Sequence, residues 1–169
     1  MLAIGTRFFG KDPAKDLPRI LKFTITSGTL GKTFVAVNTA EDKCDTIAVC
    51  AREGIDADVF AVTPWQKFVA PLNAIVYRAA LSGADRLLLA SAEFPPEAEQ
   101  ITVLSAHVND ETLVAGARFS EHEFSAGEIR GSGTTVPWNT FALWNLTHLA
   151  KIGFALVGDA PFDQKQAGV

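Results

Sequence analysis

The sequence predicts one α/β domain, spanning residues 1–169, in which helices cover both faces of a mostly parallel sheet. Two observations lead to this fold class. Short apolar runs typical of buried strands alternate with longer segments whose apolar residues recur at helical spacing. Strands that alternate with helices form right-handed crossovers, and such crossovers build a parallel sheet. The length of 169 residues, 48% of them apolar, also suits a domain with a sizeable core.

The first elements are a strand, a helix and a second strand. The apolar segment Leu2–Phe9 predicts the first strand. Asp12 before Pro13 indicates a helix start, because proline is tolerated where its missing N–H would have no partner. This helix is expected to continue to Gly28, and the apolar run Thr33–Val37 predicts the second strand.

The next segments predict a helix and a third strand. Asn38–Asp42 is polar and is expected to form a loop. Apolar residues within Asp45–Glu53 predict a short helix, which Gly54 would end. The run Asp58–Val62 then predicts the third strand, closed by Thr63 and Pro64.

The middle of the chain contains the clearest helical pattern. Its apolar face consists of Phe68, Leu72, Ile75, Val76, Ala79 and Ala80. Ser82 and Gly83 would end this helix, and Arg86–Ala90 predicts a fourth buried strand. Another helix is expected after Pro95 and Pro96. Its apolar residues are Ile101, Leu104 and Val108.

The last third predicts a strand, a long loop and a helix. Leu113–Phe119 predicts a fifth strand, and Ser120–Gly133 is a long irregular segment of the kind that often carries function. Asn139 is expected to cap a helix that ends at Gly153. Its apolar residues are Phe141, Trp144, Leu146, Leu149 and Ile152. The apolar piece Phe154–Val157 would follow as a possible last strand.

Charge and composition exclude several classes of protein. The net charge of −4 does not suggest a nucleic-acid binder, which would normally carry a basic patch. No apolar run approaches the roughly 20 residues needed to span a bilayer, and the first residues do not resemble a signal peptide. The two cysteines, Cys44 and Cys50, are expected to be free thiols. We therefore expect a cytoplasmic protein, with an oligomeric state that the sequence does not indicate.

Familiar catalytic and phosphate-binding motifs are absent from the sequence. Gly28–Thr33 partly matches a phosphate-binding loop, but it leads into a strand instead of opening a helix. No G-x-G-x-x-G follows the first strand. The three histidines do not have metal-ligand spacing, and Gly131–Gly133 lacks the frame of a nucleophile elbow.

Polar residues at the strand ends are the best candidates for a binding site, because ligands of open parallel sheets bind beyond the carboxyl ends of the strands. Thr6 and Arg7 lie at the end of the first strand, and Asn38–Asp42 follows the second. Thr63–Lys67 follows the third strand, and Ser91–Glu93 follows the fourth. We expect these four groups to converge on one edge of the sheet.

These segments resemble the family-2-like inverting glycosyltransferases of the GT-A fold, a Rossmann-like fold. Val35–Thr46 resembles the family's second strand and the acidic loop that binds the nucleoside. Leu72–Ala90 resembles the helix and strand that lead to the metal-binding D-x-D. Leu113–Phe119 resembles the next strand, and Trp138–Gly153 resembles the helix near the acceptor. The resemblance implies a nucleotide-diphospho-sugar as donor, with Mn²⁺ or Mg²⁺ as a candidate cofactor.

The chain departs from the family pattern at three places. Ser91-Ala92-Glu93 stands where the D-x-D is expected, and one glutamate makes a poor site for a divalent cation. Asn38 stands where the nucleoside loop usually has a carboxylate. Asp159 and Asp163 are the weak candidates for the catalytic base, because the expected acidic pair would fall at the end of the sequence. Either the natural chain continues past Val169 or this base is lacking.

The resemblance assigns roles to six residues and leaves the activity open. Thr6, Asn38 and Glu41 would contact the base or ribose, Arg7 or Lys67 the phosphates, and Glu93 the metal or the sugar. One interpretation is a glycosyltransferase that moves the sugar to an acceptor hydroxyl by single displacement. The alternative is a non-catalytic binding module that retains the fold. An unrelated doubly wound α/β protein is a third interpretation, since one architecture hosts many chemistries.

Overall fold

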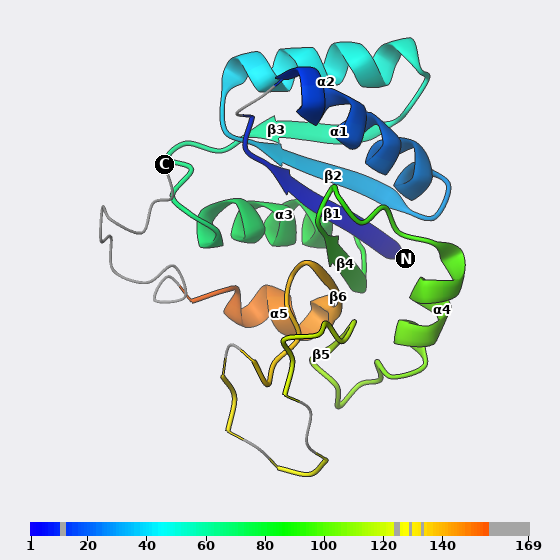
Figure 1. Cartoon of the computed structure of the whole chain (residues 1–169), viewed down its shortest axis with the longest axis vertical. Coiled ribbons are helices and arrows are strands. Elements are labelled where there is room, and N and C mark those ends of the chain that lie inside the picture. Colours follow the sequence, from blue (N-terminus) through cyan, green and yellow to red (C-terminus); the bar gives the residue numbers. More distant parts are fainter. Residues whose placement is uncertain (11–12, 124–125, 129, 133, 156–169) are drawn as a thin grey trace.

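The structure, a computed structural model, describes residues 1–10, 13–123, 126–128, 130–132 and 134–155. The strands are β1 (Leu2–Phe8), β2 (Lys32–Val37), β3 (Ala57–Ala61), β4 (Arg86–Ala90), β5 (Val114–Gly116) and β6 (Phe141–Asn145). The helices are α1 (Pro13–Gly28), α2 (Ala40–Arg52), α3 (Val69–Leu81), α4 (Ala98–Ser105) and α5 (Leu146–Ile152). The strands form one six-stranded sheet in the order β3-β2-β1-β4-β6-β5 (Figure 1).

The sheet is mostly parallel, as the sequence predicts. β1 pairs in parallel with β2 and β4, and β2 pairs in parallel with β3. β6 is the exception, because it runs antiparallel to both of its neighbours, β4 and β5. The fold is therefore an α/β fold with one reversed strand inserted near an edge.

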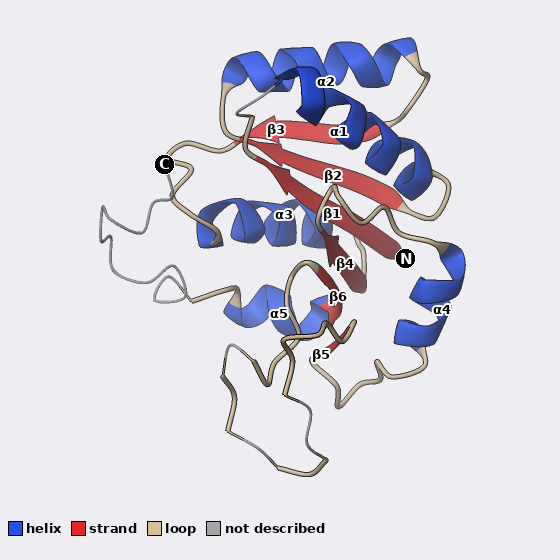
Figure 2. Ribbon diagram, viewed as in Figure 1, coloured by secondary structure: helices blue, strands red, loops and turns tan. Residues whose placement is uncertain are grey.

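Helices cover both faces of the sheet (Figure 2). On one face, Ala3 of β1 packs with Ile75 of α3 and Leu149 of α5. On the other face, Ile4 packs in a cluster with residues of α1 and α4, such as Phe23. Neighbouring residues of β1 thus enter opposite layers, and this alternation decides which helix each side chain of β1 faces.

The segment Phe141–Asn145 is a strand, so the helix expected from Asn139 onward is wrong over its first part. Only Leu146–Ile152 is helical. Phe141, Ala142 and Leu143 are buried because β6 lies inside the sheet with layers on both faces. A strand buried on both faces has no polar alternation, and its apolar residues can mimic helical spacing.

Other boundaries also differ from the expectation. Helix α2 starts at Ala40, because Thr39 caps it by accepting a hydrogen bond from Asp42 N at 2.9 Å, so Asn38–Asp42 is not a loop. β5 is confined to Val114–Gly116, at the sheet edge. Gly153, Phe154 and Ala155 form no strand, and the rest of the expected Phe154–Val157 strand lies outside the described residues.

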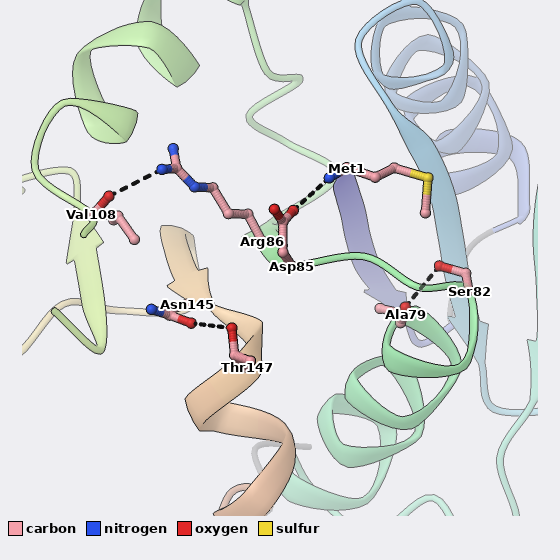
Figure 3. Close-up of polar contacts among 8 residues, drawn as sticks. All are labelled: Met1, Ala79, Ser82, Asp85, Arg86, Val108, Asn145 and Thr147. Carbon is pink, nitrogen blue, oxygen red and sulfur yellow. Dashed lines mark hydrogen bonds and ion pairs between the residues drawn. The ribbon is translucent and has the colours of Figure 1, made fainter. Parts of the chain in front are cut away.

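Polar contacts anchor the amino ends of β1 and β4 at the end of the sheet shown in Figure 3. The Met1 amine donates to Asp85 Oδ1 at 2.6 Å, and Arg86 Nη2 donates to Val108 O at 3.2 Å. Among the described helices, none combines the length and the apolar character that crossing a bilayer would require. The carboxyl ends of the same two strands, by contrast, open onto a pocket.

Candidate functional site

The pocket lies where β1 and β4 separate. Their parallel pairing runs from Leu2–Arg86 to Gly5–Leu89 and then stops, although β1 continues to Phe8 beside β2. The chain leaves β1 toward β2 on one side, and it returns through α3 to β4 on the other side. This point is the topological switch of the sheet, where ligands of open α/β folds bind.

The pocket has a volume of 460 Å³. Its walls come from the end of β1, the first turns of α1, the start of α3, the segment after β4 and the segment before β6. They are formed by Gly5, Thr6, Arg7, Phe8, Phe9, Asp16, Arg19, Phe68, Leu72, Leu89, Ala90, Ser91, Ala92, Glu93, Asn139 and Thr140. Three of the six binding residues expected from the sequence, Thr6, Arg7 and Glu93, are among them.

Thr6 is one of the residues that line this pocket, and its hydroxyl is buried. The side chain is 2% exposed, and its Oγ1 has no hydrogen-bond partner among the described residues. Buried hydroxyls in native proteins are usually paired, because leaving one unpaired costs about 1–3 kcal/mol. Thr6 therefore places a buried, unpaired polar atom on a residue of the pocket wall.

Arg7 enters the pocket from the opposite side of the sheet. Its guanidinium carbon lies 4.3 Å from the centre of the Phe68 ring, at the start of α3. Phe9 packs against Trp65 with ring centres 6.0 Å apart. Phe9 and Phe68 are each about half exposed, at 47% and 49%. The rim therefore combines one guanidinium with two accessible aromatic rings.

Ion pairs of Arg19 join α1 to the segment after β4. Arg19 Nη1 lies 3.3 Å from Glu93 Oε1 and 3.9 Å from Asp16 Oδ1. The Arg19 and Glu93 side chains are 52% and 60% exposed, whereas Asp16 is 17% exposed. One arginine thus lies between two carboxylates at the wall of the pocket.

The other expected binding residues do not line this pocket. Asn38 Oδ1 accepts a hydrogen bond from Gly10 N at 3.1 Å, so Asn38 positions the segment that follows β1. Glu41 is exposed in the first turn of α2, and Lys67 lies between β3 and α3. Asp159 and Asp163, the candidate bases, lie outside the described residues.

Sequence reasoning missed Asp16, Arg19, Phe68, Asn139 and Thr140. Asp16 and Arg19 could have been found, because the helix after the first strand of such a sheet begins beside the ligand site. Asn139 and Thr140 were not identified, because the sequence predicted a helix from Asn139 onward where strand β6 follows. Because β6 runs antiparallel to β4, it begins beside the carboxyl end of β4. Ser91 N, directly after β4, accordingly donates to Thr140 O at 2.9 Å.

A second hollow adjoins the pocket at Glu93. It measures 730 Å³ and is lined by α4, the segment before it and the residues after β5, including Phe94, Leu104 and Phe119. Phe119 stacks on Trp138 with ring centres 5.7 Å apart, and its N–H donates to His122 Nδ1 at 2.9 Å. These aromatic contacts give the hollow a packed apolar wall.

The residues at the pocket do not fit a divalent cation. Within the described part of the chain, no three His, Cys, Asp or Glu side chains lie close enough together to bind a metal ion. Of Ser91, Ala92 and Glu93, only Glu93 offers a carboxylate, and that carboxylate pairs with Arg19. Mn²⁺ and Mg²⁺ prefer several anionic or carbonyl oxygens around them.

The sequence matches no family model and no curated protein, whereas several solved structures share its architecture. The mannosyltransferase PcManGT from Pyrobaculum calidifontis, in complex with GDP-Man and Mn²⁺, superposes with a TM-score of 0.59. It is 11% identical, over 91% of this chain and 47% of that chain. S. aureus TarS 1-349 gives a TM-score of 0.56 at 13% identity, over 91% of this chain and 50% of that chain.

This is a GT-A-like fold. The chain spans about half the length of these two proteins. A 4-diphosphocytidyl-2C-methyl-D-erythritol synthase also superposes, with a TM-score of 0.54 and 14% identity over 89% of this chain and 76% of that chain. At these identities the comparisons establish the fold, and the chemistry of the site has to be argued from its own residues.

Proposed function

We propose that the protein binds a nucleotide-diphospho-sugar in the pocket between β1 and β4, as a glycosyltransferase-like domain. The observation that carries this proposal is the orphaned Thr6 hydroxyl, buried in the wall of a pocket at the switch point of a GT-A-like sheet. A ligand oxygen or N–H would pair with the hydroxyl after a small movement of the pocket wall, since the oxygen itself is buried. Neighbouring Arg7 adds the positive charge that phosphates require.

The other pocket residues fit parts of the same ligand. Phe9 and Phe68 offer half-exposed rings on which a base or a sugar can stack. Ser91-Ala92-Glu93 follows β4, where the family-2 resemblance expects a D-x-D, so Glu93 is the candidate contact to the sugar. Asn38 would act indirectly, through the Gly10 segment, and Glu41 and Lys67 would contact only a ligand that extends beyond the pocket.

Calorimetric titration with UDP-, GDP- and dTDP-sugars tests the proposal, with and without Mn²⁺. We expect one of these donors to bind, and Thr6→Val to weaken its binding roughly 3- to 10-fold, because one hydrogen bond is lost. Thr46→Val is the matched control, since Thr46 Oγ1 on α2 is also buried without a partner but does not line the pocket.

The two variants separate binding from folding. Both remove a buried, unpaired hydroxyl, so we expect both proteins to be at least as stable as the wild type toward urea. Only Thr6→Val should change the titration. If none of these sugar nucleotides binds, or if Thr46→Val weakens binding as much as Thr6→Val, the proposed site is wrong.

A non-catalytic binding module is the second candidate function. It is favoured by the scarcity of carboxylates at the described pocket, where Asp16 and Glu93 both lie against Arg19. A labelled donor distinguishes the two functions through release or transfer of the sugar. Turnover that disappears in Glu93→Ala would exclude the inert module, and binding without turnover would support it.

A further inference from the structure

An arginine side chain, flanked by two carboxylates, lies at the place where the family resemblance expects a metal. Glu93, in the segment that replaces the D-x-D, has its carboxylate oxygen 3.3 Å from Arg19 Nη1. A second carboxylate, that of Asp16, lies 3.9 Å from the same Arg19 nitrogen. A divalent cation placed here would have to compete with an arginine for its ligands.

We propose that Arg19 takes the place of the divalent cation, so that the protein binds the diphosphate of its ligand without metal. This inference rests on the proposed function, because it concerns the phosphate part of the same ligand. Arg19 and Arg7 approach the pocket from opposite sides of the sheet, Arg19 from α1 and Arg7 from the side of α3. A diphosphate between them would be contacted by two guanidinium groups.

The ion pair with Glu93 is suited to an exchange of partners. Both side chains are more than half exposed, and such exposed pairs contribute little to stability, so breaking this one costs little. A phosphate offers Arg19 more charge than a carboxylate does, together with bidentate geometry. Arg19 would therefore leave Glu93 for the diphosphate, and Glu93 would compete with the diphosphate for Arg19, whether or not it also contacts the sugar.

Replacing Glu93 with glutamine distinguishes a metal ligand from a competitor for Arg19. If Glu93 were a metal ligand, replacing it with glutamine would weaken binding of the diphosphate. If Glu93 competes for Arg19, the same replacement frees Arg19, removes a negative charge from the pocket wall and tightens binding. The sign of the change in affinity therefore decides between the two arrangements.

Calorimetric titration with inorganic pyrophosphate and with UDP, each in EDTA and in MnCl₂, is the experiment. We expect both probes to bind in EDTA with an affinity that MnCl₂ does not improve and that NaCl weakens. Arg19→Gln should weaken binding about 10-fold or more, and Glu93→Gln should tighten it about 3-fold. Lys151→Gln is the control, because Lys151 is exposed in the last turn of α5 and lines neither the pocket nor the hollows beside it.

The outcomes are distinguishable. Binding that requires Mn²⁺, weaker binding by Glu93→Gln, or equal effects of Arg19→Gln and Lys151→Gln would each overturn the role of Arg19. Pyrophosphate binding that depends on Arg19, without binding of UDP or any sugar nucleotide, would support Arg19 as the phosphate contact and overturn the proposed function. Urea unfolding of each variant shows whether the exposed substitutions leave the fold intact.

Discussion

Gly5 of β1 and Ile75 of α3 lie so close together that a β-carbon on Gly5 would overlap Ile75 Cγ2. Leu89, the partner of Gly5 on β4, would also be within 3.2 Å of that carbon. The strand can carry no side chain at this position, because α3 packs directly against it. Gly5 is also the last residue of β1 that pairs with β4, so this close packing lies at the floor of the pocket.

Gly5→Ala should therefore destabilise the protein by about 1–3 kcal/mol, since overpacking a core forces side chains to shift. Gly28→Ala is the control, because a β-carbon there would meet only Ile55, at 3.9 Å. Alanine is also the better helix former, so this control should be as stable as the wild type or slightly more stable. Urea unfolding followed by tryptophan fluorescence measures both, and equal stabilities would contradict the packing argument.

A second prediction concerns the buried hydroxyls between α1 and β2. Thr33 Oγ1 donates to Ser27 Oγ at 2.9 Å, and Ser27 Oγ donates to Phe23 O at 2.8 Å. Ser27→Ala should cost about 1–3 kcal/mol, because it leaves the fully buried Thr33 hydroxyl without an acceptor. Thr33→Val in the same chain should recover part of this loss. A double-mutant cycle measured by urea unfolding tests the coupling, and strictly additive effects would disprove it.

The two cysteines should react at very different rates. Cys44 is exposed on α2, whereas Cys50 is buried. Burial raises the pKa of the Cys50 thiol, and the nearby Thr24 hydroxyl offsets this only in part. Because the thiolate is the reactive form, a disulfide reagent should modify Cys44 in the folded protein and Cys50 only after unfolding. Cys44→Ser should abolish the fast reaction, and a fast reaction that persists in this variant would contradict the buried position of Cys50.

The fourth prediction concerns pH. The hydrogen bond from the Met1 amine lowers the pKa of Asp85 below its ordinary value of 3.8. The folded protein then binds this proton less tightly than the unfolded chain does, so the contact stabilises the protein above that value and is lost as the pH falls. Asp85 is 65% exposed, so we expect an effect below about 1 kcal/mol.

The comparison of Asp85→Asn with the wild type measures this effect. The variant should be less stable near about pH 7, and the difference should shrink as the pH falls below the ordinary aspartate pKa of 3.8. Glu111→Gln removes the same charge from an exposed position and controls for general electrostatics. A stability difference that stays constant with pH would show that the Met1 contact does not stabilise the fold.

The first four strands and three helices could be predicted because their signals are local. Pro13 marks the start of α1, Ser82 and Gly83 follow α3, and β4 is a short apolar run between turn residues. β6 could not be predicted in the same way, because its pairing with β4 joins residues far apart in the sequence. Whether Phe141–Asn145 becomes strand or helix is decided by that pairing and not by its own pattern.

The site was predictable to a similar extent. The rule about carboxyl ends of parallel strands singled out Thr6, Arg7 and Glu93, and these three residues line one pocket. Their contacts to a ligand stay predictions. The same rule could not show that Asn38 Oδ1 accepts a hydrogen bond from Gly10 N, since a contact with a neighbouring loop depends on tertiary structure. Nor could it reveal the pair between Arg19 and Glu93, whose two residues come from elements distant in sequence.

The reversed direction of β6 affects how late in synthesis the pocket can form. Asn139 and Thr140, near the carboxyl end of the described chain, complete a cavity that begins with Gly5 at the amino end. A ribosome must therefore have synthesised nearly the whole described chain before the cavity can close. Under the proposed function, ligand binding would report on finished folding, and shortened fragments that stop before β6 would not bind the ligand.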